Sequence, residues 1–97
     1  MSLQLPYAYL VCVEKVKPWA NHSRLETELR QSHRWWHYMT GVWLVLRYET
    51  LLELHDLLVP VIQQEDHMLI LPAKRPAGGW LPKDAWDWIE ANLPRDW

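Results

Sequence analysis

A chain of 97 residues with a net charge of −2 is long enough to form one small domain, which we take as residues 1–97. This charge excludes the strongly basic composition that attracts a whole domain to nucleic acid or to an anionic membrane. Cys12 is the single cysteine, which excludes an internal disulfide and indicates a reducing compartment. With no apolar run of about 18 residues and no secretory leader, we expect a cytoplasmic protein that does not contact a membrane.

The first predicted element is a β-strand over residues 7–13, which is apolar on both faces and therefore belongs at the centre of a sheet. A loop leads from it to Ser23, and Glu26 follows three residues later, which is the spacing of a helix capping box. Leu25 and Leu29 then lie on one face of a short helix.

A β-hairpin is predicted next, with strands at residues 35–39 and 42–47. The strands meet at Gly41, which can adopt the positive φ that a tight turn needs. Neither strand alternates with polar residues, so both faces of the hairpin need to be covered. The large apolar side chains form two sets, namely Trp35, Met39, Val42, Leu44 and Leu46, and Trp36, Tyr38, Trp43 and Val45.

A second helix is predicted to begin after Thr50, because Glu53 completes another capping box, and to end or kink at Pro60. Its apolar stripe consists of Leu51, Leu54, Leu57 and Leu58. A polar turn over residues 63–66 leads to a fourth strand over residues 67–71. The resulting order predicts an α+β fold of the ferredoxin-like βαββαβ type, with an antiparallel four-stranded sheet and both helices on one face.

The C-terminal segment is predicted to form a short third helix within about residues 80–93, after a mobile, basic loop over residues 72–79. Pro82 lies near the first turn of this helix and Pro94 ends it. We expect the helix to dock as a cap, with Trp80 and Trp86 anchoring its ends.

The second face of the predicted sheet carries one of the two apolar sets and has no helix of its own in the βαββαβ order. An exposed apolar patch of that size is typical of an interface. We therefore expect a homodimer packed through the open sheet face, or cover from the C-terminal segment, or both.

Charge is distributed unevenly, because residues 15–34 contain five cations and two acids, a local +3, whereas residues 48–70 contain five acids and no Lys or Arg, a local −5. The acidic segment is typical of a solvated helix face. Aromatic rings beside cations are able to stack on bases and contact phosphates. The candidate nucleic-acid-binding residues are Lys15, Lys17, Trp19, Arg30, Arg34, Lys74 and Arg75. The alternative for Trp19 is that it covers a helix end.

Two other patterns of reactive side chains are weaker indications of a functional site. His33 and His37 have the spacing of metal ligands on a helix, but their segment is predicted as strand, where four residues span about 13 Å and cannot reach one ion. Cys12 lies in the middle of an apolar strand and is expected to be a core residue.

Several motifs along residues 7–93 resemble those of the SinR-like small bacterial proteins. They are Tyr9-Leu10-Val11-Cys12-Val13-Glu14, Trp35-Trp36-His37-Tyr38, Trp43-Leu44-Val45 and Gly79-Trp80-Leu81-Pro82-Lys83-Asp84-Ala85-Trp86. Such proteins are similar in turn to the small ferredoxin-fold CRISPR-associated protein of spacer acquisition, a homodimer that binds duplex DNA and was first described as a metal-dependent nuclease.

The resemblance implies a homodimer in which an acidic residue at the end of the first strand, here Glu14, pairs across the two-fold axis with its copy to hold Mg²⁺ or Mn²⁺. The family pattern usually has aspartate at this position. The structural alternative is that Glu14 is a strand-end residue paired with Lys15 or Lys17.

From these observations we expect a non-catalytic homodimeric module that binds nucleic acid or a protein partner, linked by the resemblance to mobile-element or phage-defence biology. The alternative is a metal-dependent nuclease, a phosphodiesterase that uses the paired Glu14 carboxylates as its catalytic and metal-binding groups. We favour binding because the chain is acidic overall and shows no second catalytic group.

Overall fold

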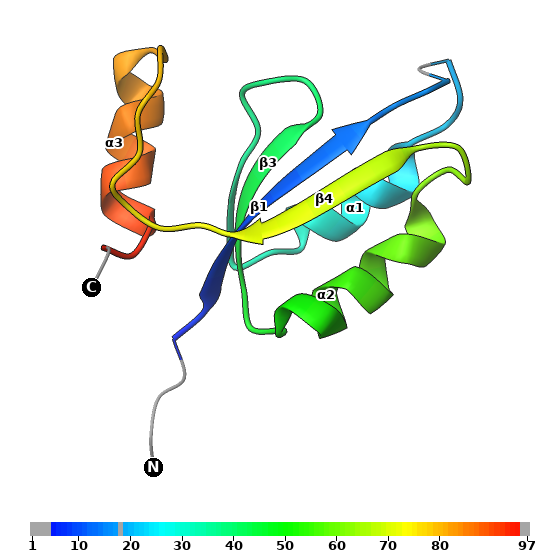
Figure 1. Cartoon of the computed structure of the whole chain (residues 1–97), viewed down its shortest axis with the longest axis horizontal. Coiled ribbons are helices and arrows are strands. Elements are labelled where there is room, and N and C mark those ends of the chain that lie inside the picture. Colours follow the sequence, from blue (N-terminus) through cyan, green and yellow to red (C-terminus); the bar gives the residue numbers. More distant parts are fainter. Residues whose placement is uncertain (1–4, 18, 96–97) are drawn as a thin grey trace.

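A computed structural model of the chain describes residues 5–17 and 19–95 (Figure 1). In chain order its elements are strand β1 (Tyr7–Glu14), helix α1 (Ser23–Arg30), strands β2 (Arg34–Trp36) and β3 (Val42–Arg47), helix α2 (Leu51–Leu58), the 3₁₀ helix η1 (Val59–Val61), strand β4 (His67–Pro72) and helix α3 (Lys83–Asn92). All strand pairs are antiparallel and the sheet order is β2-β3-β1-β4. The predicted ferredoxin-like α+β arrangement is confirmed.

Strand β1 lies at the centre of the sheet, as its two apolar faces predicted, and pairs with β3 on one side and β4 on the other. Helices α1 and α2 lie together against one face of this sheet (Figure 1). The core between them includes six side chains that are almost completely buried, each worth about 1.5 to 3 kcal/mol of transfer free energy. These are Val11, Leu25, Leu29, Val45, Leu54 and Leu58. No helix in the described part of the chain is long and apolar enough to cross a membrane.

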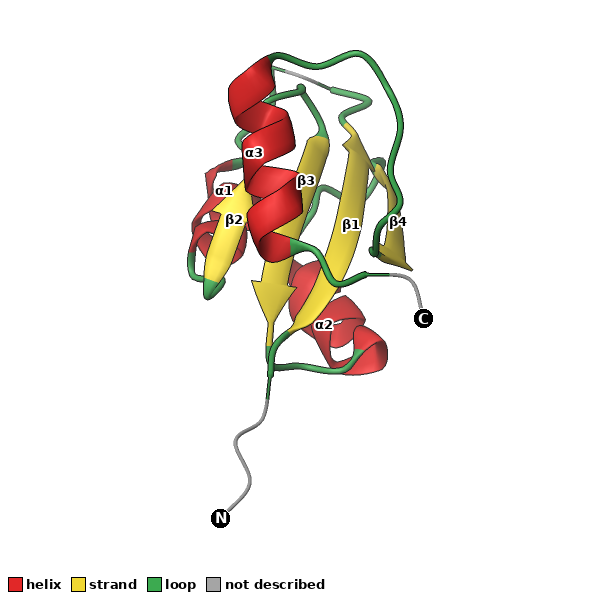
Figure 2. Ribbon diagram, turned by 90° about the vertical axis from the view of Figure 1, so that its left-hand side faces the viewer, coloured by secondary structure: helices red, strands yellow, loops and turns green. Residues whose placement is uncertain are grey.

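Helix α3 packs against the opposite face of the sheet of its own chain (Figure 2). This second core contains Ala8, Leu44, Leu46, Ile89 and Leu93. The expectation that the C-terminal helix docks as a cap is confirmed. Trp80 does not anchor it, however, because that side chain is 99% exposed, whereas the neighbouring Leu81 packs against the core instead.

Strand β2 is shorter than the predicted strand over residues 35–39, because the chain leaves the sheet at His37. The His37 ring stacks on Trp43, and its Nδ1 donates a hydrogen bond to the Val42 carbonyl oxygen at 3.0 Å. The register also regroups the predicted apolar sets, because Trp35 pairs with Val45 and Trp36 with Leu44. Trp35 therefore belongs to the α1/α2 face and Trp36 to the α3 face.

The two predicted capping boxes have different outcomes. In α2, Glu53 N donates to the Thr50 side chain and the Glu53 side chain accepts from Thr50 N, so this box is confirmed. In α1 the prediction is wrong, because Ser23 is already the first helical residue and its N–H donates to the Asn21 side chain. His22 occupies the N-cap position and is directed instead to a distant partner.

Candidate nucleic-acid interface

The guanidinium of Arg30, the last residue of α1, lies over the indole rings of two tryptophans. Its Cζ atom is 5.6 Å from the centre of the Trp35 ring and 5.9 Å from that of Trp43. Both distances are within the range of favourable cation–π interactions. Trp43 is 2% exposed and Trp35 is 40% exposed, so the cluster begins in the core and ends at the surface.

His37 completes this cluster on the other side of Trp43. The two rings are almost parallel, with centroids 3.9 Å apart and an interplanar angle of 3°. Trp35 and Trp43 lie 5.6 Å apart in a tilted arrangement. We call Arg30, Trp35, Trp43 and His37 the β2 platform. Because the buried Trp43 fixes its position, the exposed Trp35 ring and Arg30 are held in a defined arrangement at the surface.

The opposite face of β2 also carries stacked rings. Trp36 and Tyr38 are 5.9 Å apart with an interplanar angle of 19°, and Tyr38 is largely exposed. Arg34 is exposed at the start of the strand. Since β2 pairs only with β3 among the described residues, these groups surround an open sheet edge.

The cations near β2 differ in how far they are neutralised. The buried Arg47 donates from Nε to Glu49 at 2.7 Å, and its Nη2 lies 3.7 Å from a Glu28 carboxylate oxygen. The hydrogen bond from Arg47 holds the pKa of the Glu49 carboxyl below its usual range, although partial burial opposes this effect. The sequence has no acidic residue between Glu28 and Glu49, although Glu26 lies one helical turn before Arg30 on α1.

The remaining candidate residues, apart from Arg34, do not join this surface. Arg34 pairs with Leu46, which pairs with Ala8, so Arg34 lies level with the start of β1. Lys15, Lys17 and Trp19 follow the end of β1, at the opposite end of the sheet. The Lys17 ammonium is also 3.2 Å from the Glu65 carboxylate, which reduces its availability to phosphate.

Trp19 and Arg75 also differ from expectation. Trp19 is 79% exposed, so it does not cover a helix end. The guanidinium of Arg75 donates to the Glu90 carboxylate and to the Leu93 carbonyl oxygen, which fixes a residue that was predicted to lie in a mobile loop. Lys74 and Arg75 follow β4, on the sheet edge opposite β2.

Glu14 ends β1 directly opposite His67, the first residue of β4. Its Oε1 atom is 2.8 Å from His67 Nδ1, and both side chains are largely exposed. The structural alternative that paired Glu14 with Lys15 or Lys17 is replaced by this cross-strand pair. Because Val13 points into the α1/α2 core, Glu14 and His67 lie on the other face of the sheet.

A single chain does not fit a Mg²⁺ or Mn²⁺ site at this position. Within residues 5–17 and 19–95, no three His, Cys, Asp or Glu side chains gather closely enough to hold one ion. Glu14 and His67 supply one carboxylate and one imidazole, whereas Mg²⁺ prefers an octahedron of oxygen ligands. Further donors would have to come from a second chain or from a substrate.

Sequence reasoning found Arg30 but assigned Trp35 only to the core of a strand. It also missed the buried pair of His22 and Asp66 and the buried Arg47. One sequence signal could have predicted the β2 platform, namely an arginine at the end of a helix, Arg30, a few residues before the aromatic strand β2. The pairing of His22 with Asp66 and the contact of Arg47 with the Glu28 carbonyl oxygen had no local signal, because these partners lie far apart in the sequence.

No protein-family model matches this chain, and comparisons with curated proteins and with solved structures gave no match either.

Proposed function

We propose that this chain is a non-catalytic module that binds single-stranded nucleic acid through the exposed part of the β2 platform. The observation that carries the proposal is the contact of the Arg30 guanidinium with the half-exposed Trp35 ring. A base stacks on the Trp35 ring beside Arg30, and a flanking phosphate meets Arg30. The strand then passes around the open β2 edge to Arg34, which lies on the opposite face of the sheet. Single strands are favoured over duplexes because only unpaired bases offer their faces for stacking.

The net charge of −2 makes the attraction local and modest. If Arg30 and Arg34 each neutralise one phosphate, the slope of log K against log salt is roughly −1.4 for a single strand. Stacking then supplies most of the affinity, and the protein tolerates different base sequences, because every base has a π-face.

The test is fluorescence anisotropy of labelled single-stranded DNA and RNA, with a duplex for comparison, at low and moderate salt. Arg30→Ala and Trp35→Leu should each weaken binding roughly tenfold, because stacking of one base contributes about 1 to 3 kcal/mol. Trp80→Leu is the matched aromatic control and Lys83→Ala the matched cation control, since both residues are highly exposed on the C-terminal segment.

Binding that survives Arg30→Ala and Trp35→Leu unchanged would place the interface elsewhere. No binding of any strand at low salt would reject nucleic acid as the ligand and favour the other expected class, a protein partner. The same purified variants can then be used as bait in pull-down experiments that search for this protein partner.

Homodimerisation is a second part of the proposal. Helix α3 covers the β1 and β3 portion of its sheet face, but Leu69 and Leu71 on β4 are 55% and 45% exposed on the same face. We define Leu69 and Leu71 as the β4 strip. A second copy packed on this strip would remove apolar surface from water at the place where α3 leaves it open.

The metal-dependent nuclease remains the alternative function, and one observation favours it. Glu14 lies on the same sheet face as the β4 strip, so a two-fold dimer through the strip would bring two Glu14 carboxylates toward the axis. Incubation of labelled strands with Mg²⁺ or Mn²⁺ tests it, because cleavage that disappears in Glu14→Gln while binding persists would establish the nuclease. The resemblance to SinR-like proteins associates either function with mobile-element or phage-defence biology.

A further inference from the structure

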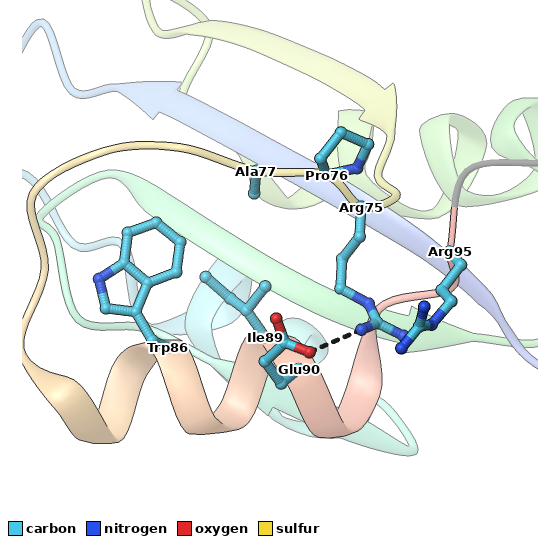
Figure 3. A pocket seen from close by; sticks show the side chains of 7 residues that line it. All are labelled: Arg75, Pro76, Ala77, Trp86, Ile89, Glu90 and Arg95. Carbon is cyan, nitrogen blue, oxygen red and sulfur yellow. Dashed lines mark hydrogen bonds and ion pairs between the residues drawn. The ribbon is translucent and has the colours of Figure 1, made fainter.

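A cavity of about 340 Å³ lies between α3 and the segment that follows β4 (Figure 3). Its walls include Arg75, Ala77, Trp86, Ile89, Glu90 and Arg95. Small-molecule sites in proteins usually have volumes of about 300 to 1,000 Å³, so this cavity suits a small ligand. None of its lining residues belongs to β2, so it is independent of the β2 platform.

Two arginines are held side by side at one end of the cavity. Arg75 and Arg95 form an isolated parallel β-bridge, and Arg75 N donates to the Pro94 carbonyl oxygen. Partners in a parallel bridge direct their side chains to the same side, and Figure 3 shows the two guanidinium groups next to each other. The backbone thus places two cations together before any ligand arrives.

Only one of these cations is neutralised within the described part of the chain. Arg75 Nη1 lies 2.7 Å from Glu90 Oε2, and Arg75 Nε donates to the Leu93 carbonyl oxygen at 2.9 Å. Arg95 is exposed and makes no ion pair with residues 5–17 or 19–95. Two arginines and one glutamate leave a net charge of +1, which favours one oxyanion at this end.

The other end of the cavity is aromatic and apolar. The partly buried Trp86 indole lines it, and Ile89 and Ala77 lie between this ring and the arginines (Figure 3). A flat ring packs well on an indole and an aliphatic floor. The two ends therefore suit different parts of one small molecule.

We propose that this cavity is a binding site for an aromatic anion of nucleotide size, with its oxyanion on Arg95 and Arg75 and its ring against Trp86. Arg75 acts with one side of its fork, because Glu90 and Leu93 occupy its Nη1 and Nε atoms. Arg95 is the main specificity residue, since its whole guanidinium fork is available for bidentate contact with phosphate or carboxylate.

The probe is adenosine 5′-monophosphate, titrated into the isotopically labelled full chain and followed through the indole Nε1–H signals, with a Trp86→Phe variant to assign that signal. Binding should shift the Trp86 signal saturably. Arg95→Ala should weaken binding of the nucleotide roughly tenfold or more. Arg95→Lys should retain only part of the affinity, because an ammonium lacks the planar fork of a guanidinium. Lys83→Ala, at the start of the same helix, should bind as the wild type does.

Inorganic phosphate and adenosine separate the two ends of the site, and each should bind more weakly than the nucleotide. Equal binding of adenosine and the nucleotide would overturn the role of the arginines, and equal binding of phosphate would overturn that of Trp86. Absence of any saturable shift would overturn the site itself. A dinucleotide with a 5′-phosphate shows whether the ligand is a free nucleotide or the end of a strand, because it binds only if the cavity accepts a strand end as well.

Discussion

His22 Nε2 lies 3.1 Å from Asp66 Oδ2, although the two residues are 44 positions apart in the chain. Their side chains are 5% and 0% exposed, and Asp66 also accepts hydrogen bonds from Val16 N and Gln63 N. This carboxylate therefore ties the loop between β1 and α1 to the turn before β4. It also explains why His22 occupies the N-cap position of α1 without capping it.

Replacing Asp66 by Ala should lower the free energy of unfolding by about 2 kcal/mol or more, because one buried and two partly buried hydrogen bonds lose their acceptor. His22→Ala should cost less, since the backbone N–H groups of Val16 and Gln63 keep Asp66 as their acceptor. Urea denaturation measures both. Glu65→Ala is the matched control, because its exposed pair with Lys17 contributes at most about 1 kcal/mol. Equal losses for Asp66→Ala and Glu65→Ala would contradict this account.

Stability should fall in acid partly through Glu49. Its folded pKa is lowered below the ordinary 4.5 by the hydrogen bond from Arg47, so its contribution is present above pH 4.5 and is lost as the pH falls through the folded pKa. The free energy of unfolding, measured with urea between pH 3 and 7, should therefore depend less on pH in Glu49→Gln. The difference in slope corresponds to roughly one bound proton or less. An unchanged pH dependence in this variant would refute the assignment.

Gly41 should not tolerate a side chain. Its φ is +76°, and a Cβ atom there would lie 2.5 Å from the Val13 carbonyl oxygen, which is backbone and cannot move away cheaply. We expect Gly41→Ala to destabilise the fold by about 2 kcal/mol or more, from left-handed strain of about 1 to 2 kcal/mol and the clash. Gly78→Ala is the control, because no atom lies within 4 Å of its added Cβ. Thermal or urea unfolding measures the stability of both variants, and equal stability of Gly41→Ala and Gly78→Ala would contradict the predicted clash.

Leu69 should report on the proposed dimer. Analytical ultracentrifugation of the wild-type chain is expected to show a dimer, and Leu69→Glu a monomer with nearly the same urea midpoint, since this side chain is 55% exposed in the single chain. Leu52→Glu, which places the same charge on the 67% exposed Leu52 of α2, should leave the dimer intact. A wild-type monomer at all concentrations would reject the β4 strip as an interface.

The local sequence determined much of the fold. Runs of residues that are apolar on both faces predicted the central position of β1, and Thr50 with Glu53 predicted the start of α2. Gly41 predicted the hairpin turn through its positive φ. Each of these signals lies within seven consecutive residues, where strand alternation, backbone sterics and first-turn hydrogen bonds dominate.

Only the tertiary structure decided which distant side chains meet. The failed capping box at Ser23, the early end of β2 at His37 and the pairing of Glu14 with His67 each depend on a partner brought in by sheet order or by a stacked ring. The predicted basic residues separated for the same reason. Antiparallel pairing sends residues after β1 and residues before β2 to opposite ends of the sheet, and that depends on topology rather than on composition.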